Sequence, residues 1–157
     1  MSDLERILKE SDDLRKSKNY VKAIDLLENA YKEDKSSNQL KTSLINLLFE
    51  FGSHQNDELV ANYDDAVLIF KRITEIEPKN YRAHYNLGIA FQNLNQLDKA
   101  LEAFQTAITI KPDYYFCYYN IGLVFEEKKD LIKAIGYYEK ALKIEPNFRY
   151  ANKQSRN

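Results

Sequence analysis

The sequence predicts an all-α fold, a solenoid of stacked helix-turn-helix repeats, and three observations lead to this class. The only prolines, Pro78, Pro112 and Pro146, end the segments IEP, IKP and IEP and recur with a period of about 34 residues. Apolar residues between them recur three and four positions apart, as on one face of a helix. Four glycines and three prolines in 157 residues leave little room for β-turns. A period of this length is typical of units that bury their apolar faces by stacking.

The third and fourth units coincide when the chain is shifted by one period. Their first helices contain the motifs YNLG and YNIG, at Tyr85–Gly88 and Tyr119–Gly122. A glycine inside a helix costs about 1 kcal/mol relative to alanine, so these glycines predict the close approach of another helix. Polar turns are expected at Asn93–Gln96 and Lys128–Asp130, between the two helices of each unit.

These positions resemble the tetratricopeptide repeat, a family whose pattern combines large, small and aromatic residues with a final proline. The matching residues of the third unit are His84, Leu87, Gly88, Phe91, Ala100, Phe104, Ala107 and Pro112. Those of the fourth unit are Tyr118, Ile121, Gly122, Phe125, Ala134, Tyr138, Ala141 and Pro146. The resemblance implies a right-handed superhelix of helix pairs. His84 takes the place of a large packing residue, so we expect a structural role for it.

The first half of the chain follows the same plan less closely. The second helix of the second unit is matched by Tyr63, Ala66, Phe70, Ile76 and Pro78, and that of the first unit by Tyr20, Ala23, Leu27 and Ala30. Because Tyr20 and Tyr63 are further apart than one period, the second unit contains an insertion of about 9 residues. We place it in the polar segment Gly52–Val60. Both a plain lengthening and a partner-contacting loop remain open.

We expect a single domain over 1–157, with repeats at approximately 4–37, 38–80, 81–114 and 115–148 and a tail at 149–157. The tail is too short for a full capping helix. The apolar side of the last helix, with Ile135, Leu142 and Ile144, is therefore expected to lack a complete cover. A weak homo-oligomer, formed through this uncapped repeat, is the alternative function.

Composition excludes several classes of protein. A net charge of −1 and an isoelectric point near 6.2 give no basic surface for nucleic acid. No apolar stretch approaches about 18 residues, which argues against a signal peptide, a membrane span or a membrane partner. The single cysteine, Cys117, allows no internal disulfide and fits a reducing compartment, so a cytoplasmic location is expected.

The sequence offers little for catalysis. It contains no Gly-rich phosphate loop, no HExxH and no CxxC. His54 has no companion at metal-ligand spacing, and Cys117 is expected to pack rather than react. Neighbouring acidic residues such as Glu126 and Glu127 point about 100° apart on a helix and do not converge. We therefore expect no enzyme, no metal and no cofactor.

In the family that the chain resembles, the first helices line a concave groove that receives an extended peptide or a partner's helix. The groove residues carried over to this sequence are Arg82, Tyr85, Asn86, Ile89, Gln92 and Asn93 in the third unit and Phe116, Tyr119, Asn120, Leu123, Glu126 and Glu127 in the fourth. Asn86 and Asn120 are equivalent, and a carboxamide offers both acceptor and donors to a peptide backbone. The alternative is that they only bond neighbouring helices.

The run Tyr114–Tyr119, YYFCYY, contains more aromatic residues than core filling needs, which is typical of an interface. One subclass of the family binds acidic chaperone tails through a clamp of lysine, arginine and asparagine. This chain departs from that clamp, with Leu8 and Asp12 in the first unit and Arg82 or Phe116 later. The predicted function is a scaffold or adaptor that binds an extended segment of another protein. A third hypothesis, less supported by the sequence, is an accessory subunit of an enzyme complex.

Overall fold

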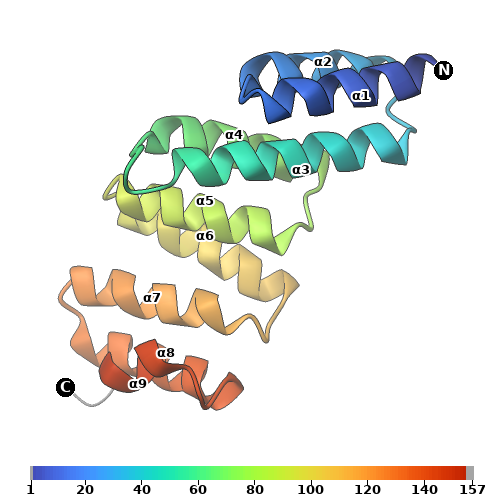
Figure 1. Ribbon diagram of the computed structural model, residues 1–157. Coiled ribbons are helices and arrows are strands. Elements are labelled where there is room, and N and C mark those ends of the chain that lie inside the picture. The colour runs from blue at the N-terminus through green and yellow to red at the C-terminus, as the bar shows by residue number, and fades with distance from the viewer. Residues whose placement is uncertain (1, 155–157) are drawn as a thin grey trace.

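The computed structural model describes residues 2–154, and this part of the chain contains nine α-helices and no strand. They are α1 (Asp3–Lys16), α2 (Tyr20–Glu33), α3 (Asn38–Gln55), α4 (Tyr63–Ile76), α5 (Tyr81–Asn93), α6 (Leu97–Ile110), α7 (Tyr115–Glu127), α8 (Leu131–Ile144) and α9 (Arg149–Gln154). The first eight form four pairs that stack in chain order, with the two ends of the chain at opposite ends of the stack (Figure 1). The predicted all-helical solenoid is confirmed.

The two helices of each pair are joined by a related turn. One residue of each turn has a left-handed backbone, at φ 59° in Lys18, 51° in Ala61, 56° in Asn95 and 64° in Lys129. The next amide donates back to a carbonyl inside the first helix, as from Gln96 to Phe91 over 2.8 Å. This hydrogen bond satisfies a carbonyl at the helix end. It also gives a common reference point for aligning the four units.

In the third and fourth pairs, a glycine of the first helix packs against an aromatic ring of the second helix. A Cβ atom on Gly88 would lie 2.5 Å from Cε1 of Phe104, and one on Gly122 would meet Tyr138 equally closely. Both rings are buried. Even alanine at these positions would overlap the ring, which is why the sequence carries glycine there.

The turn register locates the extra residues of the second unit. The Gln55 carbonyl accepts from the Asn62 amide over 3.1 Å, so Gln55 is the counterpart of Phe91. Gly52, three residues earlier, packs on Phe70 as Gly88 packs on Phe104. The connection is therefore only two residues longer than in the third unit.

Most of the insertion lies earlier, inside α3. This helix has 18 residues where α5 and α7 have 13 each. Its N-cap, Ser37, lies about four helical turns before Gly52, whereas in the third unit the N-cap Asn80 lies only about two turns before Gly88. Our placement of the whole insertion in Gly52–Val60 is thus wrong. The added turns carry Leu40 and Leu44, which continue the helical periodicity and hide the insertion in the sequence.

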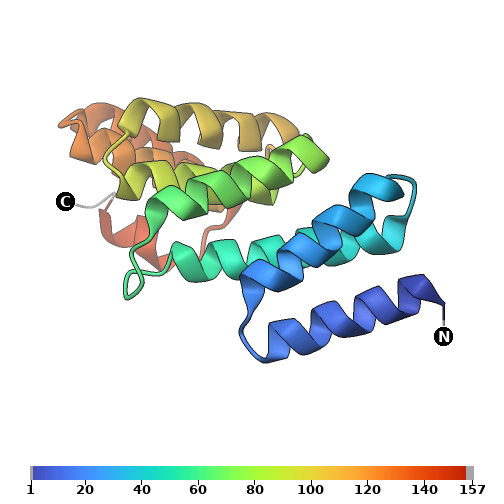
Figure 2. The same cartoon turned by 90° about the horizontal axis from the view of Figure 1, so that it is seen from above.

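The longer α3 displaces the first helix pair. The part of α3 before Gly52 is seven residues longer than the matching part of α5, which adds about 10 Å. Both views of the stack show α1 and α2 lying to one side of the later pairs (Figures 1 and 2). Arg72 of α4 fastens the displaced pair by donating to both carboxylate oxygens of Glu28 in α2, over 2.6 and 2.7 Å. This bidentate pair raises the pKa of Arg72.

At the other end, α9 occupies the place of a further first helix. The Phe148 amide donates to Glu145 as the Tyr114 amide donates to Lys111 at the start of α7. Ala151 is fully buried, and it therefore covers part of α8. Leu142 is half-buried, whereas Ile135 and Ile144 are each 37% exposed. Within the described residues, the cover of the last pair is incomplete, as predicted.

Candidate binding groove

The first helices α1, α3, α5 and α7 are linked to one another by side chains, and we call their shared side the first-helix face. Arg15 of α1 donates to Glu50 of α3 over 3.3 Å. The Asn120 carboxamide of α7 donates to the Tyr85 hydroxyl of α5 over 3.2 Å. Such bonds hold successive units in a fixed relation along this face.

Asn120 makes two side-chain hydrogen bonds in the predicted groove. Its Nδ2 donates both to the Phe116 carbonyl, over 2.8 Å, and to the Tyr85 hydroxyl. Both N–H groups are therefore in use, while its Oδ1 has no hydrogen bond within residues 2–154. Burial raises the pKa of Tyr85, so its hydroxyl stays protonated while its oxygen accepts the bond from Asn120. Asn120 thus bonds a neighbouring helix and keeps only an acceptor for a ligand.

The side chain of Asn86 makes fewer hydrogen bonds than that of Asn120. Its Nδ2 donates to the Arg82 carbonyl over 2.8 Å, and neither its second N–H nor its Oδ1 has a partner among the described residues. The residue of α3 that matches Tyr85 is Phe49, which has no hydroxyl to accept a bond. Of these two asparagines, Asn86 alone has both a donor and an acceptor that no described residue uses.

Other predicted groove residues connect α5 to its neighbours. Arg82 lies over the Phe49 ring at 5.0 Å. Gln92 donates to Glu127 over 2.5 Å, and Asn93 donates to Asn56, which in turn donates to the backbone of Asn86. Ile89 is half-buried against the core.

The predicted groove residues of α7 differ in how open they are. Glu126 is bound by the Tyr138 hydroxyl over 2.6 Å, so this carboxylate belongs to the contact between α7 and α8. Burial and this bond both raise the pKa of Tyr138. Leu123 packs half-buried against the small core cluster of α8 and α9.

The excess aromatic residues of α7 pack on the segment that follows α8. Phe148 meets the rings of Tyr115, Phe116 and Tyr119 at centroid distances of 5.0, 5.7 and 5.1 Å. Tyr150, which is 69% exposed, lies beside Phe148 at 5.8 Å. These rings form an aromatic cluster at the C-terminal end of the first-helix face.

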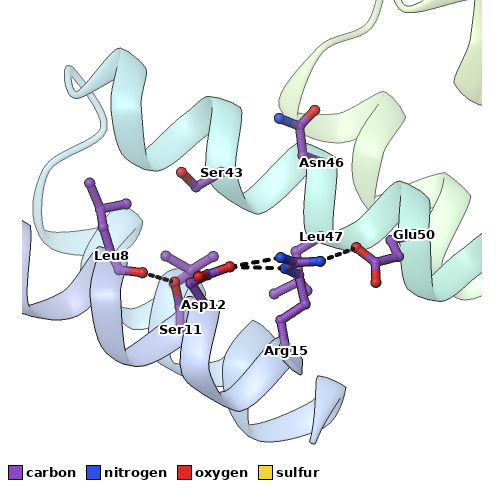
Figure 3. A pocket seen from close by; sticks show the side chains of 9 residues that line it. Leu8, Ser11, Asp12, Arg15, Ser43, Asn46, Leu47 and Glu50 are labelled. Atoms are coloured by element: carbon purple, nitrogen blue, oxygen red, sulfur yellow. Dashed lines mark hydrogen bonds and ion pairs between the residues drawn. The ribbon is translucent and has the colours of Figure 1, made fainter. Parts of the chain in front are cut away.

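A hollow of about 310 Å³ lies at the opposite end, between α1 and α3 (Figure 3). It contains the Arg15 guanidinium, which donates to Asp12 over 2.8 Å and to Glu50 over 3.3 Å. Hydrogen bonds from Lys16 and Arg15 lower the pKa of Asp12. The whole lining consists of Leu8, Ser11, Asp12, Arg15, Leu27, Ser43, Asn46, Leu47 and Glu50.

Sequence reasoning did not predict this hollow as a site, although Leu8 and Asp12 entered the comparison with the clamp. The signal was available in the spacing of small residues. Ser11 precedes Ala23 by the same spacing as Gly88 precedes Ala100, and Ser11 is accordingly buried. Extending that spacing to α1 would have brought Asp12 and Arg15 onto the first-helix face.

The side chains of His84, Tyr118 and Cys117 are hydrogen-bonded to the backbone or buried. His84 places Nε2 2.8 Å from the Pro78 carbonyl, and Tyr118 donates to the Pro112 carbonyl over the same distance. Cys117 is buried, and burial raises the pKa of its thiol to about 12. Within residues 2–154, no group of three acidic, histidine or cysteine side chains could hold a metal ion. No helix in that range is long and apolar enough to cross a membrane.

The stacked helix pairs, with first helices joined by side-chain hydrogen bonds, define a helical-repeat protein. Residues 81–114 and 115–148 each match the family model described as the tetratricopeptide repeat. Residues 81–148 are thus two tetratricopeptide repeats, and repeats of this family serve as protein-interaction modules. No curated protein sequence matches it.

Solved structures resemble the chain over most of its length. A crystal structure of MamA is 26% identical, with a TM-score of 0.68, and the match covers 92% of this chain and 80% of that one. YrrB, described as a TPR protein with an unusual peptide-binding site, is 18% identical, with a TM-score of 0.63 and coverage of 96% and 91%. The first TPR of Spaghetti (RPAP3), bound to the HSP90 peptide SRMEEVD, is 23% identical, with a TM-score of 0.66 and coverage of 71% and 87%.

Proposed function

We propose that this chain is a non-catalytic scaffold or adaptor whose first-helix face forms a groove for an extended segment of another protein. The observation that carries the proposal is the equivalence of Asn86 and Asn120 on adjacent first helices, each with a carbonyl oxygen that no described residue uses. Asn86 offers a donor and an acceptor to a backbone group of the segment. Asn120, with both N–H groups occupied, offers its acceptor.

We also propose that the two ends of the groove bind chemically different parts of the partner. The aromatic cluster around Phe116 and Phe148 supplies apolar area with polar edges, which suits apolar side chains of the partner. The hollow between α1 and α3 supplies carboxylates and a guanidinium. The proposed location is cytoplasmic, on the basis of composition alone.

Acidic chaperone tails are not the proposed partner. The first unit presents Asp12, and the second presents Glu50, where a carboxylate-binding clamp needs cationic or neutral donors. Arg15 is already held between these two carboxylates. The carboxylates of a peptide such as SRMEEVD would be repelled by the carboxylates at this end of the groove, and this repulsion lowers the affinity.

The test begins with peptides selected from a random library against the intact chain. Replacing both Asn86 and Asn120 by alanine should lower the affinity for a selected peptide by roughly tenfold or more. Each lost hydrogen bond costs about 0.5–1.5 kcal/mol of binding free energy. Isothermal titration would measure the change, with Glu102→Ala on the exposed side of α6 as the matched control. Equal affinity of the double variant and the parent would move binding to another face.

A further inference from the structure

The outer side of α8 differs from that of α4 and α6 at the second residue of the helix. Ile132 is 87% exposed, whereas the same place in α4 and α6 is taken by Asp64 and Asp98. A single exposed aliphatic residue needs no explanation. Here, however, Leu131 is also 58% exposed and Ile135 37% exposed, so the three form one apolar patch.

Beside this patch the helix has a dent. Gly136 lies one turn after Ile132, and a Cβ built on it would meet nothing within 4 Å. The matching residue of α6 is Glu102. Unlike Gly88, Gly136 therefore has no packing reason among the described residues, although a glycine costs about 1 kcal/mol in a helix.

We propose that α8 pairs with α8 of a second copy of this chain, antiparallel and about a two-fold axis, with Ile132 of each copy seated on Gly136 of the other. A two-fold interface must be complementary to itself, because the same patch serves both copies. The α8 patch meets this condition, since a protruding side chain and a dent lie four residues apart on one helix. Glycine also lets two helix backbones approach closely.

Charges support the same alignment. In an antiparallel pair with Ile132 over Gly136, the turn residue Lys129 of one copy comes near Glu139 of the other. Both are exposed, and neither has an ion pair among the described residues. Their attraction favours this register over one shifted by a helical turn.

A closed pair is favoured over an open chain of copies. Head-to-tail stacking would need a free apolar face on α1 to cover α8, but α1 exposes no large hydrophobic side chain over residues 3–16. The contact involves one helix face per copy, so its area lies in the range of weak, transient interfaces, below about 1,200 Å².

Sedimentation equilibrium on the full chain from roughly 10 µM to 1 mM tests the pairing, since weak interfaces dissociate in this range. The parent should shift from monomer to dimer as the concentration rises. Ile132→Asp and Gly136→Glu, which copy α6, should remain monomeric with unchanged circular dichroism. The matched control is Val21→Asp, at the same place in α2, where Val21 is 59% exposed; it should associate like the parent.

A cross-linking experiment tests the geometry itself. When Ile132→Cys and Gly136→Cys proteins are mixed and oxidised by diamide, disulfides should form mainly between unlike chains. Cys117 is buried and should not compete. A parent that stays monomeric throughout, an Ile132→Asp variant that still dimerises, or disulfides mainly between like chains would overturn the proposal.

Discussion

The two C-terminal units and the first unit pack their helices in different ways. In the third and fourth units a glycine of the first helix lies against Phe104 or Tyr138 with no room for a Cβ atom. In the first unit Ser11 takes the place of the glycine, and Leu27 takes that of the aromatic ring. Glycine is thus required by the size of the residue opposite it, and not by the solenoid as such.

The largest effect is expected when a side chain is added beneath an aromatic ring. Gly88→Ser should destabilise the fold by about 1–3 kcal/mol, because it overpacks a buried contact. Chemical denaturation measures the loss. In a Phe104→Leu background, which reproduces the pairing of Ser11 with Leu27, the same change should cost clearly less. Equal costs in both backgrounds would show that the ring does not impose the glycine.

A second prediction separates the third unit from the fourth. Tyr138→Phe should cost about 1 kcal/mol, since it removes the hydroxyl that donates to Glu126 over 2.6 Å. The third unit is built with Phe104 at this place and needs no such bond. Combining Tyr138→Phe with Glu126→Gln, the residue found at the matching place in α5, should recover part of the loss in denaturant titrations. A loss that the second change does not alter would contradict this account.

A smaller effect of opposite sign is expected at Gly136, where an added Cβ atom would meet no described residue within 4 Å. Gly136→Ala should raise the stability of the monomer by about 0.5–1 kcal/mol, because alanine is the better helix former. Thermal unfolding in dilute solution measures this gain. A loss of stability in the monomer would mean that Gly136 has an intrachain role after all.

The smallest effect concerns acid stability at the N-terminal end. Hydrogen bonds from Lys16 and Arg15 lower the pKa of Asp12 in the folded state below its ordinary value of 3.8. The ionised form therefore stabilises the fold above that value, and this contribution disappears as the pH falls through the lowered pKa. The stability difference between the parent and Asp12→Asn should be largest near neutral pH and vanish in strong acid. A difference independent of pH would exclude an ionic role.

The sequence predicted the fold well wherever residues recurred at a fixed spacing. Gly88, Phe104 and their counterparts identified the helix pairs, because overlap of a ring with a neighbouring backbone leaves few choices of residue. The site was less accessible to prediction. Whether Asn120 donates one of its N–H groups to Tyr85 depends on the distance between α5 and α7, which cannot be derived from the spacing of residues along the chain.

The hollow between α1 and α3 was missed for a related reason. It arises where the displaced first pair meets the lengthened α3, and the length of that helix was misjudged. The polar segment after Gly52 was conspicuous, whereas the extra turns around Leu40 and Leu44 looked like ordinary helix. Sequence patterns therefore detected the repeated packing inside each pair better than the junction between unlike pairs.

The two extra turns of α3 also affect how such an array is detected and counted. Seven residues turn a helix through about 700°, only about 20° short of two full revolutions, so every side chain beyond them keeps its orientation. The fold absorbs the addition without exposing its core, but a template with a fixed period falls out of phase. The family model matches 81–114 and 115–148 and does not match the second unit, which contains the added turns. In solenoids of this kind, insertions of whole turns leave the architecture intact while concealing units from linear comparison.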